Sequence, residues 1–285
     1  MKLLPISLKP RKVKIDAGAL ALDLIGYGAI AFFLLPLVVV ILTSFTSGNS
    51  IAFPPELPLS LKWYKAFFED PLFRQSLLKS LQIAGMTIAL SVPLATAAAV
   101  GFTRKRFRGE DIVYFLIFLP FLVPGIVLGI GLLTSLEPLR IGFLQNFPYL
   151  GSSPIVVIGH SLWATPLAFL VMVAVLRGLD PALRDAAMSL GASPLRTFLE
   201  ITLPLTRAGL LAAVILAFVV SFHEFVMAAF LTSAEDRTLP VRIFDSLRFE
   251  VRPIIAAVDS LMIFSVMVAL VLIGRLIGIE KIKLH

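Results

Sequence analysis

The sequence contains no cysteine, and only 15% of its 285 residues are charged. The missing thiols exclude disulfide bonds, thiolate metal sites and a cysteine nucleophile. A soluble domain of this length would carry roughly 25% charged residues, so the polar residues present are too few to cover a soluble globule. The sequence also lacks the G-x-x-x-x-G-K-[ST] phosphate-binding loop and the His-Glu-x-x-His metal motif. Any ATP must therefore be bound by another chain, and we expect no metal ion and no catalytic residue here.

Apolar residues make up 58% of the chain, and the mean hydropathy is +0.96. They form six runs that are long enough to cross a hydrocarbon layer of about 30 Å as helices. Backbone polar groups in lipid must be paired within the segment, which favours helices over isolated strands. The sequence therefore predicts one all-α integral membrane domain over residues 1–285. The six predicted spans are Leu24–Phe45, Leu77–Gly101, Ile112–Thr134, Pro154–Leu176, Ala208–Leu231 and Ile254–Ile277.

The distribution of basic residues predicts the orientation. Six spans place both termini on one side, and sixteen of the 25 Lys and Arg residues fall on that side, nine on the other. The positive-inside rule then puts both termini in the cytoplasm. The basic residues of these loops explain the net charge of +7. We therefore expect the chain to interact with a lipid bilayer and not with nucleic acid. The first apolar run follows a basic N-terminus without signal-peptide spacing, so we expect it to be a retained span.

The outer segment Leu61–Phe73 alternates aromatic and charged residues. It could lie as a helix on the outer surface. The preferred interpretation is that its aromatic residues anchor the chain at the membrane interface.

The cytoplasmic loop between the fourth and fifth predicted spans, residues 177–209, is too long for a simple helical hairpin. Asp180-Pro181 and Ser193-Pro194 each combine a helix N-cap with proline at the first helical position. Gly191 suits the left-handed residue that ends a helix, and Leu203-Pro204 is expected to close the second helix. The pattern predicts two short helices at an angle. This knob could fit a cleft in a soluble partner, or it could pack only on its own bundle.

The same loop resembles the EAA loop of permease subunits in binding-protein-dependent ABC importers. That motif reads Glu-Ala-Ala, three residues, Gly, nine residues and Ile-x-Leu-Pro. The sequence has Asp185-Ala186-Ala187, Gly191 and Ile201-Thr202-Leu203-Pro204 at the same spacing. The one departure is Asp185, which keeps the charge of glutamate but shortens its reach by one methylene.

The resemblance implies the six-helix fold of a type I importer permease in the bacterial inner (plasma) membrane. It implies that the subunit pairs with a second permease and that two ATP-binding subunits, holding ATP and Mg²⁺, dock on the EAA loops. A periplasmic or extracellular solute-binding protein would deliver the solute. The expected coupling residues are Asp185, Ala186, Ala187, Gly191, Ser193, Pro194, Phe198, Leu203 and Pro204.

Three further stretches, Ser60–Phe68, Ser221–Ser233 and Thr238–Ile263, resemble the second permease of spermidine/putrescine-type importers. This resemblance implies a small, polyamine-like cationic solute. Carriers of opines or other amino-acid conjugates and of ferric ions remain alternatives, because family similarity does not settle the solute. An intramembrane enzyme such as a lipid-modifying transferase is disfavoured by the missing motifs.

Two carboxylates lie within predicted spans, Glu224 in the fifth and Asp259 in the sixth. A charge at mid-bilayer costs about 2.5–3.5 kcal/mol, so both are expected to face the bundle or a water-filled path. Ser221 shares a helix face with Glu224, which suggests Ser221, Glu224 and Asp259 as candidates for a substrate pathway. Alternatively, each carboxylate pairs with an arginine of the partner permease, or with Arg248 or Arg252. His160-Ser161 lacks the geometry of a serine hydrolase, and His223 is expected to pack in the bundle.

Overall fold

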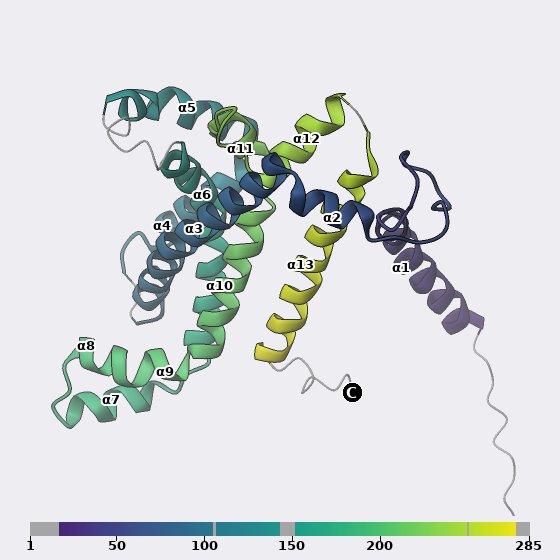
Figure 1. The fold of residues 1–285 in the computed structure, drawn as a ribbon. Helices are drawn as coiled ribbons and strands as arrows, with labels where there is room; N and C mark the ends of the chain where they lie inside the picture. Colours follow the sequence, from purple (N-terminus) through teal and green to yellow (C-terminus); the bar gives the residue numbers. More distant parts are fainter. Residues whose placement is uncertain (1–16, 105–106, 143–151, 250, 278–285) are drawn as a thin grey trace, which may run out of the picture.

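The computed structural model describes residues 17–104, 107–142, 152–249 and 251–277, and this part of the chain is helical without strands (Figure 1). Some of the basic residues that are predicted to lie in the cytoplasm, at positions 2–14, 105–106, 281 and 283, are outside the described residues. The helices are α1 (Ala17–Thr43), α2 (Lys62–Glu69), α3 (Pro71–Arg104), α4 (Glu110–Leu122), α5 (Gly125–Gly142), α6 (Ser153–Arg177), α7 (Pro181–Ser189), α8 (Pro194–Thr197), the π-helix η2 (Phe198–Thr202), α9 (Leu203–Leu205), α10 (Arg207–Phe222), α11 (Val226–Leu231), α12 (Leu239–Phe249) and α13 (Pro253–Ile277).

Helices α3, α6 and α10 pack against one another and form the centre of the bundle. Small side chains such as Ala95, Ala168 and Ala213 are fully buried at their contacts and let the helices approach closely. Gly209 of α10 lies against Val175 of α6, and a Cβ atom there would overlap the Val175 side chain. Large residues such as Phe169 and Met172 fill the space around these contacts.

Among the described residues, four helices are long and apolar enough to cross a membrane, namely α1, α3, α6 and α13. Two bent helix pairs bring the number to at most six. The chain therefore has the helices of a multi-pass membrane protein, whereas the predicted count of six spans stays a prediction.

The third predicted span, Ile112–Thr134, is not one helix. Helix α4 ends at Leu122, α5 begins at Gly125, and the two axes differ by 100°. The break falls at Val123-Pro124, where proline lacks an N–H and forces the residue before it into an extended conformation (Val123 has φ −96° and ψ 129°). Pro36, Pro93, Pro120 and Pro166, by contrast, lie inside helices, as expected of a bundle.

The fifth predicted span, Ala208–Leu231, is also interrupted. Helix α10 ends at Phe222 and α11 begins at Val226. Neither proline nor glycine lies at this break. It is stabilised by Glu224, whose carboxylate accepts hydrogen bonds from the backbone N–H groups of Met227 and Ala228 at 2.8 and 2.9 Å. The prediction that Ser221 and Glu224 share one face of a continuous helix is therefore wrong.

The outer segment that was expected to anchor at the membrane interface forms helix α2 and packs inside the protein. Trp63 and Phe67 are 9% and 1% exposed and belong to one core cluster with residues of α3, α10, α12 and α13. The Trp63 indole N–H donates to the Gly48 carbonyl at 3.1 Å. The preferred interpretation, interfacial anchoring, is wrong for these two aromatic residues, because α2 buries its apolar face on the bundle.

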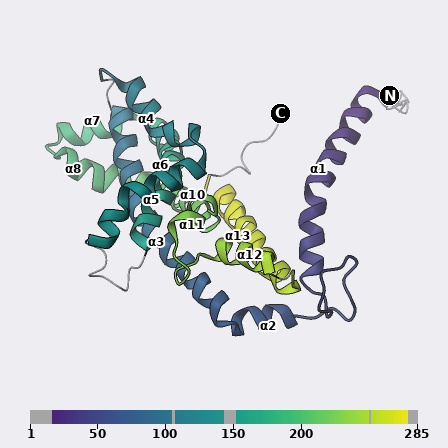
Figure 2. The ribbon, with the colours of Figure 1, turned by 90° about the horizontal axis from the view of Figure 1, so that it is seen from above.

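The two ends of the bundle differ in what they carry. The start of α1 and the end of α13 lie toward the same end as α7, α8 and α9, whereas α2, α5, α11 and α12 lie toward the other (Figure 1). Helix α1 stands beside the bundle and contacts α13 (Figure 2). At the end opposite α7, Asp236 joins the start of α6 to α3: it lies 2.9 Å from the Lys79 ammonium and accepts from the Ser152 N–H at 2.9 Å.

Candidate coupling elbow, buried polar cluster and open carboxylate

Residues 177–209, hereafter the elbow, adopt the two-helix form that their caps predict. The Asp180 side chain accepts from the Ala182 N–H at 2.9 Å and begins α7. The Ser193 hydroxyl accepts from the Arg196 N–H at 3.2 Å and begins α8. Each cap pairs a backbone donor that the first helical turn leaves free.

Gly191 turns the chain between these helices. Its φ of +88° lies in the left-handed region, where a residue with a Cβ atom is strained. The Gly191 N–H donates to the Met188 carbonyl at 3.0 Å, and the Ala192 N–H donates to the Ala187 carbonyl at 3.1 Å. This is the Schellman arrangement that closes a helix, so the glycine of the motif fixes the angle of the elbow.

The second arm of the elbow is longer than the sequence suggests. Leu203-Pro204 does not close a helix, because α8 continues through the π-helix η2 into α9 and ends at Thr206. Proline is accepted there because its missing N–H falls in the first turn of α9. The arm, Pro194–Leu205, meets α10 at 76°.

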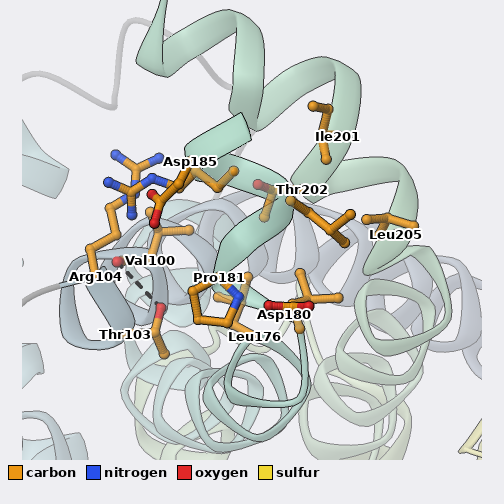
Figure 3. Close-up of a pocket in the computed structure, with 13 residues that line it drawn as sticks. Val100, Thr103, Arg104, Leu176, Asp180, Pro181, Asp185, Ile201, Thr202 and Leu205 are labelled. Atoms are coloured by element: carbon orange, nitrogen blue, oxygen red, sulfur yellow. Dashed lines mark hydrogen bonds between the residues drawn. The ribbon is translucent and has the colours of Figure 1, made fainter. Parts of the chain in front are cut away.

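A small cavity of about 110 Å³ lies at the root of the elbow (Figure 3). Arg104 of α3 and Asp185 of α7 line it from one side, and Ile201, Thr202 and Leu205 line it from the other arm. Of the expected coupling residues, only Asp185 lines this cavity. Asp185 and Ala186 are exposed, as are Gly191, Ser193, Pro194 and Pro204, while Ala187, Phe198 and Leu203 are partly buried.

The elbow also exposes large apolar side chains at its tip. Leu190 is 89% exposed and Leu195 is 67% exposed. Burial of these leucines would be expected if the two helices packed only on their own bundle. An apolar tip on a protruding element is instead typical of a surface that a protein partner covers.

A buried polar cluster joins the α10–α11 break to the bundle centre. The Glu224 carboxylate lies 3.1 Å from His160 Nε2, and both side chains are 1% exposed. His160 Nδ1 lies 2.8 Å from the Ser221 hydroxyl, which donates to the Thr87 hydroxyl at 3.2 Å. Four helical elements, α3, α6, α10 and α11, therefore meet at these polar groups.

This cluster changes the interpretation of three predicted residues. Glu224 is held by His160 and two backbone N–H groups, and neither Arg248 nor Arg252 is its partner in the described structure. Ser221 is bonded within the same cluster, so the substrate-pathway role of both residues stays a prediction. His160 was not predicted as a partner of Glu224, because its neighbours in the sequence carry no sign of that contact. His223, expected only to pack, lies 3.1 Å from the Ser265 hydroxyl.

Asp259 differs from Glu224 in its surroundings. It borders a cavity of about 240 Å³ between the α10–α11 break, α12 and α13. Phe225 and Phe244 line the same cavity, and their ring centroids lie 4.9 Å apart. The part of the chain that the structure describes offers Asp259 no ion pair and no hydrogen bond, and it holds no cluster of three His, Asp or Glu residues that could bind a metal ion.

Residues 91–279 match the family described as the binding-protein-dependent transport system inner membrane component. This match covers more than half of the chain. The chain belongs to that family. It is a permease subunit of a binding-protein-dependent ABC importer, as the spacing of its elbow motif predicted.

Curated relatives extend the match beyond the C-terminal two thirds. The chain is 30% identical over 236 residues to the putrescine transport system permease protein PotI of Escherichia coli (strain K12), covering 82% of this chain and 83% of PotI. It is 26% identical to the spermidine/putrescine transport system permease protein PotC of the same strain, covering 89% and 92% of the two chains.

The fold has a solved counterpart in a bacterial ABC transporter involved in the import of the acidic polysaccharide alginate. The TM-score is 0.68 at 16% identity, and the match covers 96% of this chain and all of that one. This similarity establishes the importer permease fold and carries no information on the solute.

Proposed function

We propose that this permease crosses the bacterial inner membrane six times, with both termini and the elbow in the cytoplasm. The proposal rests on the excess of basic residues predicted on that side and on the position of the elbow at the same end of the bundle as the start of α1 and the end of α13 (Figure 1). The bent pair α4–α5 then lies within the membrane, where broken helices are tolerated when they are buried in protein. The bend between Pro194–Leu205 and α10 lies where the cytoplasmic elbow meets the fifth span.

The elbow is the site at which the ATP-hydrolysing subunits bind this chain. The exposed tip formed by Leu190 and Leu195 carries the proposal, because an unpartnered apolar tip on the cytoplasmic side needs a protein partner. Residues Asp185 to Pro204 then transmit the movement of the ATPase to α6 and α10. The full assembly contains a second permease, forming a heterodimer with this chain, two ATPase subunits and a solute-binding protein, and ATP and Mg²⁺ are bound outside this chain.

The solute is a small polyamine-like cation, and this chain forms half of its path. Support comes from the relatives, whose names specify putrescine and spermidine, and from the open carboxylate Asp259. An opine or amino-acid conjugate would bring a carboxylate of its own toward Asp259, and a ferric ion would need more oxygen ligands than one carboxylate supplies. An intramembrane enzyme has no supporting residue cluster in the described structure.

The coupling role is tested by replacing the two exposed leucines. We expect the Leu190→Ser/Leu195→Ser double variant to lose about tenfold or more of the ATPase subunit that co-purifies with the permease, because central apolar residues contribute most of the binding energy of an interface. Leu57→Ser is the matched control, since Leu57 is 77% exposed in the chain segment before α2. That control should retain the ATPase.

Insertion of the double variant into the membrane is measured in parallel, and it should equal that of the parent. Unchanged recovery of the ATPase with the double variant would show that the elbow is not its binding site.

A further inference from the structure

The cavity beside Asp259 has the composition of a site for an organic ammonium ion. Its walls are the rings of Phe225 and Phe244 and the apolar side chains of Ile243, Leu247 and Met262. One carboxylate, that of Asp259, supplies the charge. No hydroxyl, amide or basic side chain lines this cavity.

Asp259 is unusual among the carboxylates near this end of the bundle. Asp236 is paired with Lys79 at 2.9 Å, Asp245 with Arg237 at 3.2 Å, and Glu224 with His160 at 3.1 Å. Asp259 is partly buried in protein surroundings that offer it no partner among the described residues. A carboxylate in an apolar wall without a partner is expected to attract a cation from outside.

The aromatic rings favour the same class of ligand. A cation lies favourably over a phenyl face, and the Arg248 guanidinium already lies 5.1 Å from the Phe244 ring centroid. Phe225 lies at the α10–α11 break, so the ring next to the cavity is positioned by the segment that Glu224 caps. The aliphatic walls suit the methylene chain of an amine, for which water is a poorer solvent.

The position of Asp259 places this cavity near the end of the bundle that carries α12. Asp259 lies six residues after Pro253, the first residue of α13, which is about 9 Å along the helix. Helix α12 lies at the same end of the bundle (Figure 1). The cavity is therefore within reach of a solute released at that end.

We propose that Asp259, Phe225 and Phe244 form a binding site for a primary alkylammonium group, through which this permease itself recognises its solute. The carboxylate binds the ammonium, the rings flank it, and Ile243, Leu247 and Met262 contact the methylenes. The site rejects oxyanions by repulsion from Asp259 and rejects ferric ions for lack of further ligands. The identity of the biological solute rests on the proposed function, whereas the binding of an ammonium group by this site does not.

The first test measures binding to the assembled permease–ATPase complex without its binding protein. Saturation-transfer NMR with n-butylammonium and with putrescine should show transfer to the ligand in the parent complex. The signal should fall at least fivefold in Asp259→Asn and in Phe244→Leu, and Asp259→Glu should keep most of it. The matched control is Asp245→Asn, which removes a nearby charge that does not line the cavity and should bind as the parent does.

The second test measures putrescine uptake into proteoliposomes that contain the complete transporter. Asp259→Asn should raise the KM for uptake about tenfold or more, while its co-purification with the second permease stays unchanged. Equal ligand binding by the parent and Asp259→Asn would overturn the amine site. Loss of the second permease from Asp259→Asn would also overturn it, because Asp259 would then be an assembly residue. Asp259-dependent binding without uptake of putrescine or spermidine by the parent would contradict only the proposed solute.

Discussion

Glu224 illustrates how one side chain decides the course of a helix. A charged residue in an apolar run suggested a solute pathway, yet its carboxylate ends the first half of the run and caps the second. The Nε2 atom of His160 lies 3.1 Å from the same carboxylate. A buried carboxylate with three partners is stabilised where it is, so Glu224 first of all holds the α10–α11 break in place.

We predict that His160→Ala destabilises the complex by about 1–3 kcal/mol, because Glu224 and Ser221 each lose a buried partner. Thermal unfolding in detergent measures the effect. His223→Ala is the matched control: His223 is only partly buried and loses one hydrogen bond, to Ser265, so its effect should be smaller. An equal effect of the two substitutions would show that the buried cluster contributes no more to stability than the single hydrogen bond of His223.

Asp236 gives a pH-dependent contribution to stability outside the membrane-spanning helices. Burial raises its pKa, but hydrogen bonds from Lys79 and Ser152 outweigh burial, and the pKa lies below its ordinary value. A group whose pKa is lower in the folded state stabilises that state fully above its unfolded pKa, about 3.9, and this contribution is lost as the pH falls through the folded-state value.

We therefore predict that Asp236→Asn lowers the melting temperature at neutral pH and that the difference from the parent shrinks below about pH 4. Thermal unfolding across pH measures it. A difference that stays constant down to pH 2.5, in a complex that remains assembled, would contradict the role of the Asp236 carboxylate.

Helix ends were more predictable than helix interruptions. The caps at Asp180 and Ser193 and the left-handed Gly191 follow from local chemistry, so the turn of the elbow was predicted from sequence, whereas the length of its second arm was not. The bend at Val123-Pro124 had a local signal, but its size of 100° depends on how α5 packs. The break at Glu224 combines a local contact, the capping of Met227 and Ala228, with the approach of His160 from a distant part of the sequence. Contacts of this kind are set by packing, and a single sequence does not show them.

Helices α6 and α10 are in tight contact at Gly209, next to the end of the elbow. We predict that Gly209→Ala destabilises the complex by about 1–3 kcal/mol, because the added methyl group overlaps Val175 and forces the helices apart. Gly85→Ala in α3, where a Cβ atom meets nothing within 4 Å, should instead be neutral or stabilising by up to about 1 kcal/mol. The melting temperatures of the two variants test this prediction. Destabilisation by both substitutions would show that the contact between Gly209 and Val175 is not the cause.

At the scale of the whole molecule, the two ends of the bundle carry different candidate sites. One end carries the elbow with its apolar tip, and the other carries α2, α12 and the cavity beside Asp259. The central helices α3, α6 and α10 join these ends and are held by close alanine contacts and by the Glu224–His160 cluster. Under the proposed function, movement imposed on the elbow reaches the opposite end of the bundle through α6 and α10, which pack directly on each other.

The central claim is that the elbow tip contacts the ATPase subunit from the cytoplasmic side. It is tested most directly by placing a photo-crosslinking amino acid at position 190 of the assembled transporter in membranes, with position 57 as the control. We predict a covalent adduct between position 190 and the ATPase subunit and none from position 57. An assembled, ATP-hydrolysing transporter in which position 190 yields no such adduct, or is reached by a membrane-impermeant reagent from outside, would contradict the account.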